Sequence, residues 1–166
     1  MKKHDVIFLD FDGVLNYRGF LRAGQRIGTA DQLCPERVAR LRDICDQTGA
    51  VIVVSSTWRL HRTPRSLQAS LKRRGLTCRI VGATPRLATH NRGDEIVTWL
   101  DVNRERVDRF CIVDDDETAA IVTGEPDVTR EFRKRYVRTS YDAVEDVSDG
   151  GLQVRDVERA VRILRG

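Results

Sequence analysis

Short apolar runs alternate along the chain with longer segments in which apolar residues recur at helical spacing. The run at residues 6–9 is continuously apolar and ends at Asp10, as expected of a strand that is buried on both faces. Five short runs predict strands, at residues 6–9, 51–54, 79–82, 110–113 and 136–139. Four segments predict helices: residues 35–49, residues 63–75, a segment that begins at Asp94 and Glu95, and residues 154–164.

Prolines and glycines mark several of these boundaries. Pro35 suits the first turn of a helix, and Gly49 suits the position just after its end. Thr63 followed by Pro64 is typical of a helix cap and the first helical residue. Residues 16–34 contain glycines and few apolar positions, so we expect a loop or a small flap there.

The alternation of strands and helices predicts an α/β fold. Crossover connections of this kind give a mostly parallel sheet, so we expect one Rossmann-like, three-layer domain with five strands over residues 1–166. Ligands of such sheets bind beyond the carboxyl ends of the strands. Those ends are therefore where functional residues are expected.

Composition excludes several classes of protein. The chain has 166 residues, of which 40% are hydrophobic and 33% charged, which favours a folded globule over a disordered chain. No apolar stretch approaches the roughly 18–20 residues that a membrane span requires, and Asp5 and Asp10 interrupt any signal-like segment. The four cysteines show no metal-binding spacing, so we expect buried free thiols and a cytoplasmic location without membrane partners.

Charge is distributed unevenly along the chain. The formal net charge is +4, and no acidic residue occurs between Asp46 and Asp94. That interval contains many arginines, which suit bidentate contacts with phosphate, although a run of charges is also typical of an ordinary solvated face. The basic residues there are Arg59, Arg62, Arg65, Lys72, Arg73, Arg74, Arg79, Arg86 and Arg92.

Acidic residues stand at the ends of two predicted strands. Asp10 and Asp12 follow the first strand, and Asp114 and Asp115 follow the fourth. Carboxylates that converge from two strand ends repel one another unless a cation neutralises them. Hard oxygen ligands of this kind suit Mg²⁺, which keeps part of its coordination shell for water and substrate phosphate.

Complementary groups stand at the ends of the other predicted strands. Ser55 and Ser56 follow the second strand with hydroxyls that can donate to an oxyanion. Arg92 follows the third strand and precedes the next helix, where a guanidinium can contact phosphate. Each feature alone is weak, but their joint occurrence at strand ends favours a catalytic phosphate site.

These residues resemble the motifs of the haloacid dehalogenase (HAD) superfamily. Residues 10–15, Asp-Phe-Asp-Gly-Val-Leu, are similar to its first motif, and Ser55, Arg92 and the pair Asp114–Asp115 are similar to the other three, in the same order. More narrowly, residues 55–59, 81–85 and 93–96 look like the HAD domain of "Swiss Army Knife" RNA repair proteins. The resemblance covers most of the chain and implies a HAD-type phosphatase domain with a minimal cap.

The resemblance also implies a mechanism. Asp10 would be the nucleophile that forms an aspartyl-phosphate, and Asp12 the general acid and then the general base. Mg²⁺ would be held by Asp10, the backbone carbonyl of Asp12, and either Asp114 or Asp115. Beside it, Ser55 and Arg92 would hold the transferring phosphoryl group.

The segments between the motifs leave no room for a large cap, which favours an open site for the end of a macromolecule. Together with the basic residues between Asp46 and Asp94, an open site predicts a phosphorylated substrate such as an RNA or DNA end. The residues we expect to contact it are Ser56, Arg59, Arg18 and Arg22, with Arg26, His61 and Arg62 as further candidates. Trp58 could stack on a base or pack beneath the site, whereas Trp99 is expected in the core.

Two other functions remain open at this point. The same chemistry could serve a small substrate such as a nucleotide or sugar phosphate, or a phosphoprotein. A non-catalytic module that only binds phosphate is the third class. Ser55 stands where a phospho-receiver would have its acceptor aspartate, and a retired phosphatase would have lost Asp10 or Asp12, so both observations argue against this class.

Overall fold

The predicted apolar runs form one parallel sheet. In a computed structural model, which describes residues 3–25, 28–142 and 150–166, five strands are arranged in the order β3-β2-β1-β4-β5. All neighbouring strands are parallel. The strands are β1 (His4–Leu9), β2 (Val51–Val54), β3 (Ile80–Ala83), β4 (Val107–Asp114) and β5 (Tyr136–Arg138).

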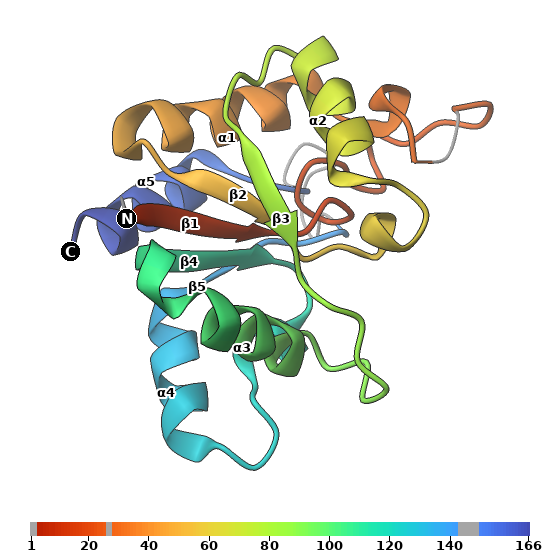
Figure 1. Cartoon of the computed structure of the whole chain (residues 1–166). Helices are drawn as coiled ribbons and strands as arrows, with labels where there is room; N and C mark the ends of the chain where they lie inside the picture. Colours follow the sequence, from red (N-terminus) through yellow and green to blue (C-terminus); the bar gives the residue numbers. More distant parts are fainter. Residues whose placement is uncertain (1–2, 26–27, 143–149) are drawn as a thin grey trace.

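Helices cover both faces of this sheet and complete three layers (Figure 1). One face carries α1 (Pro35–Thr48), α2 (Pro64–Arg73) and α5 (Val154–Arg165). The opposite face carries α3 (Arg92–Asn103) and α4 (Pro126–Arg135). Short 3₁₀ helices occur in the connections: η1 (Ala30–Gln32), η2 (Thr57–Leu60), η3 (Arg104–Arg106) and η4 (Glu117–Ala120).

The sequence signals for the first two helices are confirmed. Pro35 begins α1, and Gly49 ends it in the left-handed conformation with φ of 69°. Thr63 caps α2, because its side chain accepts a hydrogen bond from the Ser66 amide. The α/β class and the parallel five-stranded sheet are likewise as predicted.

One helix was not predicted. In α4 only Phe132 is buried, and Val128 is partly buried against the same cluster, so the segment has too few apolar residues to show a clear stripe. The segment at residues 16–34 is a series of turns in its described part, and η1 is the helical element there. Among the described residues, no helix combines the length and apolar character needed to cross a bilayer.

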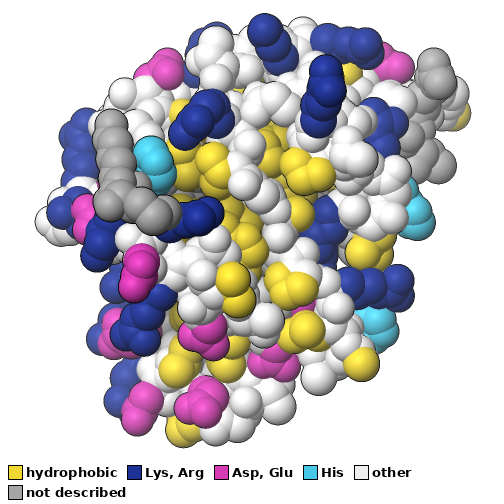
Figure 2. All heavy atoms as spheres, viewed as in Figure 1, with side chains coloured by type: hydrophobic (Ala, Val, Ile, Leu, Met, Phe, Trp, Pro, Cys, Tyr) yellow, Lys and Arg dark blue, Asp and Glu magenta, His cyan; other side chains and the backbone are white. Residues whose placement is uncertain are grey.

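Two further expectations about buried residues need correction. All four cysteines are free as expected, but Cys78 is only partly buried because it lies just before the edge strand β3. Trp99 contacts Phe8 edge to face, with ring centroids 5.4 Å apart, yet it is also only partly buried. Trp99 lines an apolar hollow beside β3, where Val81 is 44% exposed, and Figure 2 shows hydrophobic side chains on this surface.

The chain order of the strands determines where the site forms. From the central strand β1 the chain moves outward to β2 and β3, then returns to the other side of β1 to form β4 and β5. The amide of Asp10 donates to the carbonyl of Val113 at 3.0 Å, so the ends of β1 and β4 lie together at this reversal. Such switch points are where open α/β sheets bind ligands.

Gly93, the second residue of α3, permits a close contact between this helix and the backbone just after η4. A Cβ atom at this position would lie 2.0 Å from the carbonyl oxygen of Ile121, just beyond η4. We expect Gly93→Ala to lower the free energy of unfolding by about 1–3 kcal/mol, because α3 must move away from rigid backbone. Urea denaturation measures this change. Val102→Ala, on the same helix at an 83% exposed position, is the control and should change stability little; equal stability of the two variants would contradict the prediction.

Candidate active site

The first functional carboxylate lies at the carboxyl end of β1. Asp10 is 1% exposed, and its Oδ1 accepts a hydrogen bond from the Phe11 amide at 2.7 Å. The chain then turns at once, since the Leu15 amide donates to the Phe11 carbonyl at 2.8 Å. Residues 10–15 therefore form a buried strand end followed by a tight turn. This turn fixes the Asp10 carboxylate at the carboxyl end of β1.

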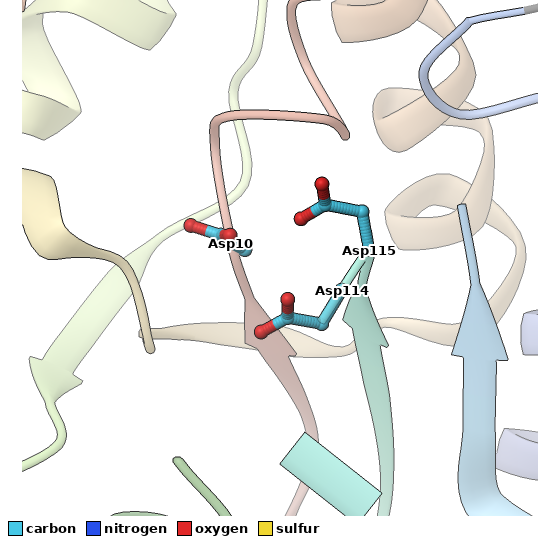
Figure 3. A group of neighbouring side chains, drawn as sticks. All are labelled: Asp10, Asp114 and Asp115. Atoms are coloured by element: carbon cyan, nitrogen blue, oxygen red, sulfur yellow. The ribbon is translucent and has the colours of Figure 1, made fainter. Parts of the chain in front are cut away.

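Asp114 and Asp115 bring two more carboxylates to the same place. Asp114 ends β4 and is fully buried, and Asp115 follows it in a half-buried position. One oxygen atom from each of Asp10, Asp114 and Asp115 lies within 4.8 Å of the other two. Figure 3 shows the three side chains around one shared space, at the ends of neighbouring strands.

Gly13 makes room for this arrangement. It adopts φ of +72°, and a Cβ atom there would lie 2.3 Å from the Cγ atom of Asp115. A side chain at position 13 would therefore be strained and would displace the Asp115 carboxylate. Gly13 is thus required for the Asp115 carboxylate to occupy its position in the cluster.

Arg92 connects the strand ends. It is the first residue of α3, whose start is fixed by the Asn91 side chain accepting from the Asp94 amide at 3.0 Å. Its Nη1 lies 3.0 Å from a carboxylate oxygen of Asp10 and 3.0 Å from one of Asp114. The same Nη1 donates to the backbone carbonyl of Ser55.

Burial and mutual repulsion dominate the electrostatics of the carboxylates. Burial raises the pKa of Asp10, although the nearby Arg92 opposes this effect. Burial and then the charge of Asp10 raise the pKa of Asp114 well above its ordinary value, and the same causes raise the pKa of Asp115 to about 6. Burial opposes the charge of Arg92, but Asp10 and Asp114 outweigh it and raise the pKa of that guanidinium.

Asp12 lies outside the three-carboxylate cluster and is held separately. The Asn16 amide nitrogen donates to one of its oxygens at 2.7 Å, and the Trp58 indole N–H donates to the other at 3.0 Å. Trp58 is 7% exposed and contacts the Phe11 ring edge to face. Of the two expected roles of Trp58, the structure shows packing beneath the site and not a free surface for stacking on a base.

The serines lie at the end of β2. The Ser55 amide donates to the Leu9 carbonyl at 2.8 Å, which places Ser55 beside the end of β1. Its hydroxyl is buried and has no hydrogen-bond partner among the described residues. Ser56 caps η2 by accepting from the Trp58 amide, and a hydrogen bond from its side chain reaches Asp10.

The Arg59 guanidinium, which the sequence predicts to contact the substrate, is engaged in contacts within the protein. It forms an ion pair with Glu95, and both side chains are less than 10% exposed, at 7% and 5%. It also donates to the carbonyl oxygens of Thr84, Ser56 and Pro85. Arg59 therefore ties η2 to the loop after β3 and to α3, and these contacts occupy the atoms that were expected to bind substrate.

Arg18 and Arg22, the described arginines of the predicted flap, form their contacts with residues outside the acidic cluster. Arg18 is 75% exposed and pairs with Asp142 at 2.8 Å. Arg22 is exposed and donates to the carbonyls of its own turn, at Gly19 and Leu21. Arg26 lies outside the described residues.

Sequence reasoning missed the supporting residues of the site. Asn16 follows the first motif directly, so its position was a usable signal for a partner of Asp12. Glu95 was interpreted as an acid that suits the start of a helix, but it is buried and also accepts from the Leu87 amide at 3.1 Å. No local pattern indicates that pairing, because its partner Arg59 lies on a different element.

The donor set fits a divalent cation. Three carboxylates surround one space, and one guanidinium cannot neutralise them all. All the candidate ligand atoms are hard oxygens, as Mg²⁺ prefers. The unpartnered Ser55 hydroxyl is a further buried group that a bound oxyanion would satisfy.

The fold and the site together define the class of the protein. A parallel sheet with an aspartate-containing turn after β1, a serine after β2, an arginine at the start of α3 and two aspartates after β4 is the HAD arrangement. Residues 6–144 match the family described as "HAD domain in Swiss Army Knife RNA repair proteins", and the chain belongs to this family. No curated protein and no solved structure is significantly similar to it.

Asp115 provides a test of the electrostatics. Its pKa is about 6 in the folded chain against an ordinary 3.8, so the folded state holds its proton more tightly than the unfolded state does. The contribution of Asp115 to stability therefore falls as pH rises from about 4 to about 6. Without divalent cations, we expect Asp115→Asn to raise the Tm more at pH 8 than at pH 4.5.

Thermal unfolding in EDTA and in Mg²⁺ measures this difference. The wild-type Tm should rise on addition of Mg²⁺ at pH 8, and the variant should gain less, because it lacks one charged ligand. Asp101→Asn, at an exposed position on α3, is the control. An equal Mg²⁺-dependent gain in wild type and Asp115→Asn, with no pH-dependent difference between them, would contradict the assignment.

Proposed function

We propose that this chain is a Mg²⁺-dependent phosphomonoesterase that removes a terminal phosphate from nucleic acid ends through an aspartyl-phosphate. The observation that carries the proposal is the convergence of three carboxylates, two of which Arg92 contacts, beside the buried hydroxyl of Ser55, which has no partner among the described residues. Carboxylates alone would repel a phosphate. The guanidinium and the hydroxyl supply the groups that bind its oxygens.

In the first step, an oxygen of Asp10 attacks phosphorus, and the bond from phosphorus to the ester oxygen breaks. Asp12 gives its proton to the departing oxygen, which leaves as an alcohol. The donors Asn16 and Trp58 hold the Asp12 carboxylate in one orientation during this transfer. Arg92 and the Ser55 hydroxyl stabilise the equatorial phosphoryl oxygens.

In the second step, Asp12 takes a proton from water, and the water oxygen attacks the phosphorus of the aspartyl-phosphate. The bond between phosphorus and the Asp10 oxygen breaks, which releases inorganic phosphate and restores the carboxylate. Asp10, the backbone carbonyl of Asp12, and Asp114 or Asp115 would hold Mg²⁺. When bound, the ion would offset the negative charge of the phosphoryl oxygens.

Two observations support a nucleic acid end as the substrate. The family that the chain belongs to is described by its occurrence in RNA repair proteins. The segments that follow Ser55 and precede Arg92 also carry exposed basic side chains without any acid between residues 47 and 93. The exposed basic residues between Ser55 and Arg92 are His61, Arg65, Lys72, Arg73, Arg79, Arg86 and His90.

Asp10→Asn tests the chemistry. The change keeps the shape of the side chain but removes the nucleophilic carboxylate, so we expect phosphate release to fall by about three orders of magnitude or more. The assay uses 3′- and 5′-phosphorylated oligonucleotides and mononucleotides, each with Mg²⁺ or EDTA. Wild-type turnover in Asp10→Asn would contradict the mechanism. Equal, poor turnover of oligonucleotides and mononucleotides by the wild type would contradict the substrate.

The two tryptophans give a matched test of how Asp12 is positioned. Trp58→Phe removes the indole N–H that donates to Asp12, so we expect kcat to fall about 10-fold to 100-fold while KM stays unchanged. Trp99→Phe, on the opposite face of the sheet, should leave both parameters unchanged. Equal kcat values for the two variants would show that the indole does not position Asp12.

A further inference from the structure

A polar hollow of about 500 Å³ lies directly beside the acidic cluster. Asp115 forms one wall of it, so the hollow adjoins the space between the three carboxylates. Residues just after β5 and at the start of α5 form the other walls. None of the residues lining this hollow has a role in the chemistry proposed above except Asp115.

Thr139 lines this hollow, and its buried hydroxyl has no hydrogen-bond partner among the described residues. Its residue is 6% exposed, and its amide donates to the Asp114 carbonyl at 3.1 Å, so it stands next to the metal-binding strand end. A polar group bound in the hollow would supply the missing partner of this hydroxyl.

The acidic side chains of the hollow are engaged elsewhere. Asp142 forms an ion pair with Arg18 at 2.8 Å, and Asp156 accepts a hydrogen bond from the Gln153 amide at 2.8 Å. Asp115 belongs to the three-carboxylate cluster. The charge of Asp142 is therefore paired within the protein, and a cation held by the acidic cluster would offset that of Asp115.

The cationic side chains of the hollow are available to a ligand. Arg155 is exposed and forms no ion pair among the described residues. Among the described residues, Arg138 forms an ion pair with Glu117 alone, and because both side chains are more than 60% exposed, this contact is easily exchanged. The positive end of the α5 helix dipole lies at the same wall and favours an anion.

We infer that this hollow binds the second phosphate of the substrate, which lies one sugar away from the phosphate that is removed. Arg155 and Arg138 would contact its oxygens, and the Thr139 hydroxyl would donate to an oxygen of the same phosphate or its sugar. A nucleic acid strand carries such a phosphodiester next to its end, and a nucleoside bisphosphate carries a second phosphate as a monoester. The inference rests on the proposed function and defines its substrate more narrowly.

The test compares substrates that differ only in the second phosphate. A terminally phosphorylated dinucleotide, a nucleoside 3′,5′-bisphosphate and a nucleoside monophosphate are assayed with Mg²⁺. We expect the wild-type kcat/KM to favour the dinucleotide over the monophosphate, and Arg155→Gln to reduce this preference about tenfold. Arg162→Gln is the control, because Arg162 is an exposed arginine two turns further along α5 and should keep the wild-type preference.

Thr139→Val tests the buried hydroxyl. Valine has a similar shape and removes a polar group that lacks a partner, so the Tm should stay the same or rise, whereas the preference for the dinucleotide should fall. A lower Tm with an unchanged preference would overturn the role of this hydroxyl. A preference for the bisphosphate over the dinucleotide would identify the second phosphate as a monoester.

A binding measurement separates this inference from the proposed function. Fluorescence anisotropy with a labelled, terminally phosphorylated dinucleotide is measured on Asp10→Asn and on Asp10→Asn combined with Arg155→Gln. About tenfold weaker binding by the double variant supports the subsite, even if no phosphate ester is hydrolysed and the proposed function fails. Equal affinities of the two proteins, or faster hydrolysis of a phosphopeptide than of the dinucleotide, would overturn the inference.

Discussion

The site depends on one guanidinium held between two buried carboxylates. Asp10 and Asp114 end neighbouring strands and are removed from water, and Arg92 lies 3.0 Å from an oxygen of each. Without this cation the two charges would repel each other in a medium that cannot screen them. Because Asp115 adds a third carboxylate, the cluster keeps an excess of negative charge that suits a divalent ion.

Arg92 can occupy this position only because α3 is fixed from several sides. Gly93 allows the helix to approach the backbone after η4, and the Asp94 carboxylate accepts from the Thr123 amide at 2.7 Å. Glu95 forms the buried ion pair with Arg59, which links the same helix turn to η2 behind Ser55. Arg92, which contacts Asp10 and Asp114, and the residues that hold α3 in place are therefore consecutive in the sequence.

The two sides of the acidic cluster differ in a way that suits an extended substrate. On the side of β2 and β3, buried contacts of Arg59 and Trp58 make a rigid wall beneath Ser55 and Asp12. On the side of β5, a hollow with exposed arginines adjoins Asp115. Under the proposed function, the phosphate would be held on the first side, and the rest of the substrate would extend over the second.

The sequence by itself determined the strands, most helices, and the residues at the strand ends, because short apolar runs and the residues that end them are local properties. It did not determine α4, whose few apolar residues form no clear stripe. Only the tertiary structure decided that the Trp58 indole donates to Asp12 and that Glu95 pairs with Arg59. It also decided that the Thr139 hydroxyl lacks a partner beside Asp114. The physical reason is that hydrogen bonds and ion pairs between separate elements depend on how those elements pack. Residue spacing along the chain does not reveal this packing.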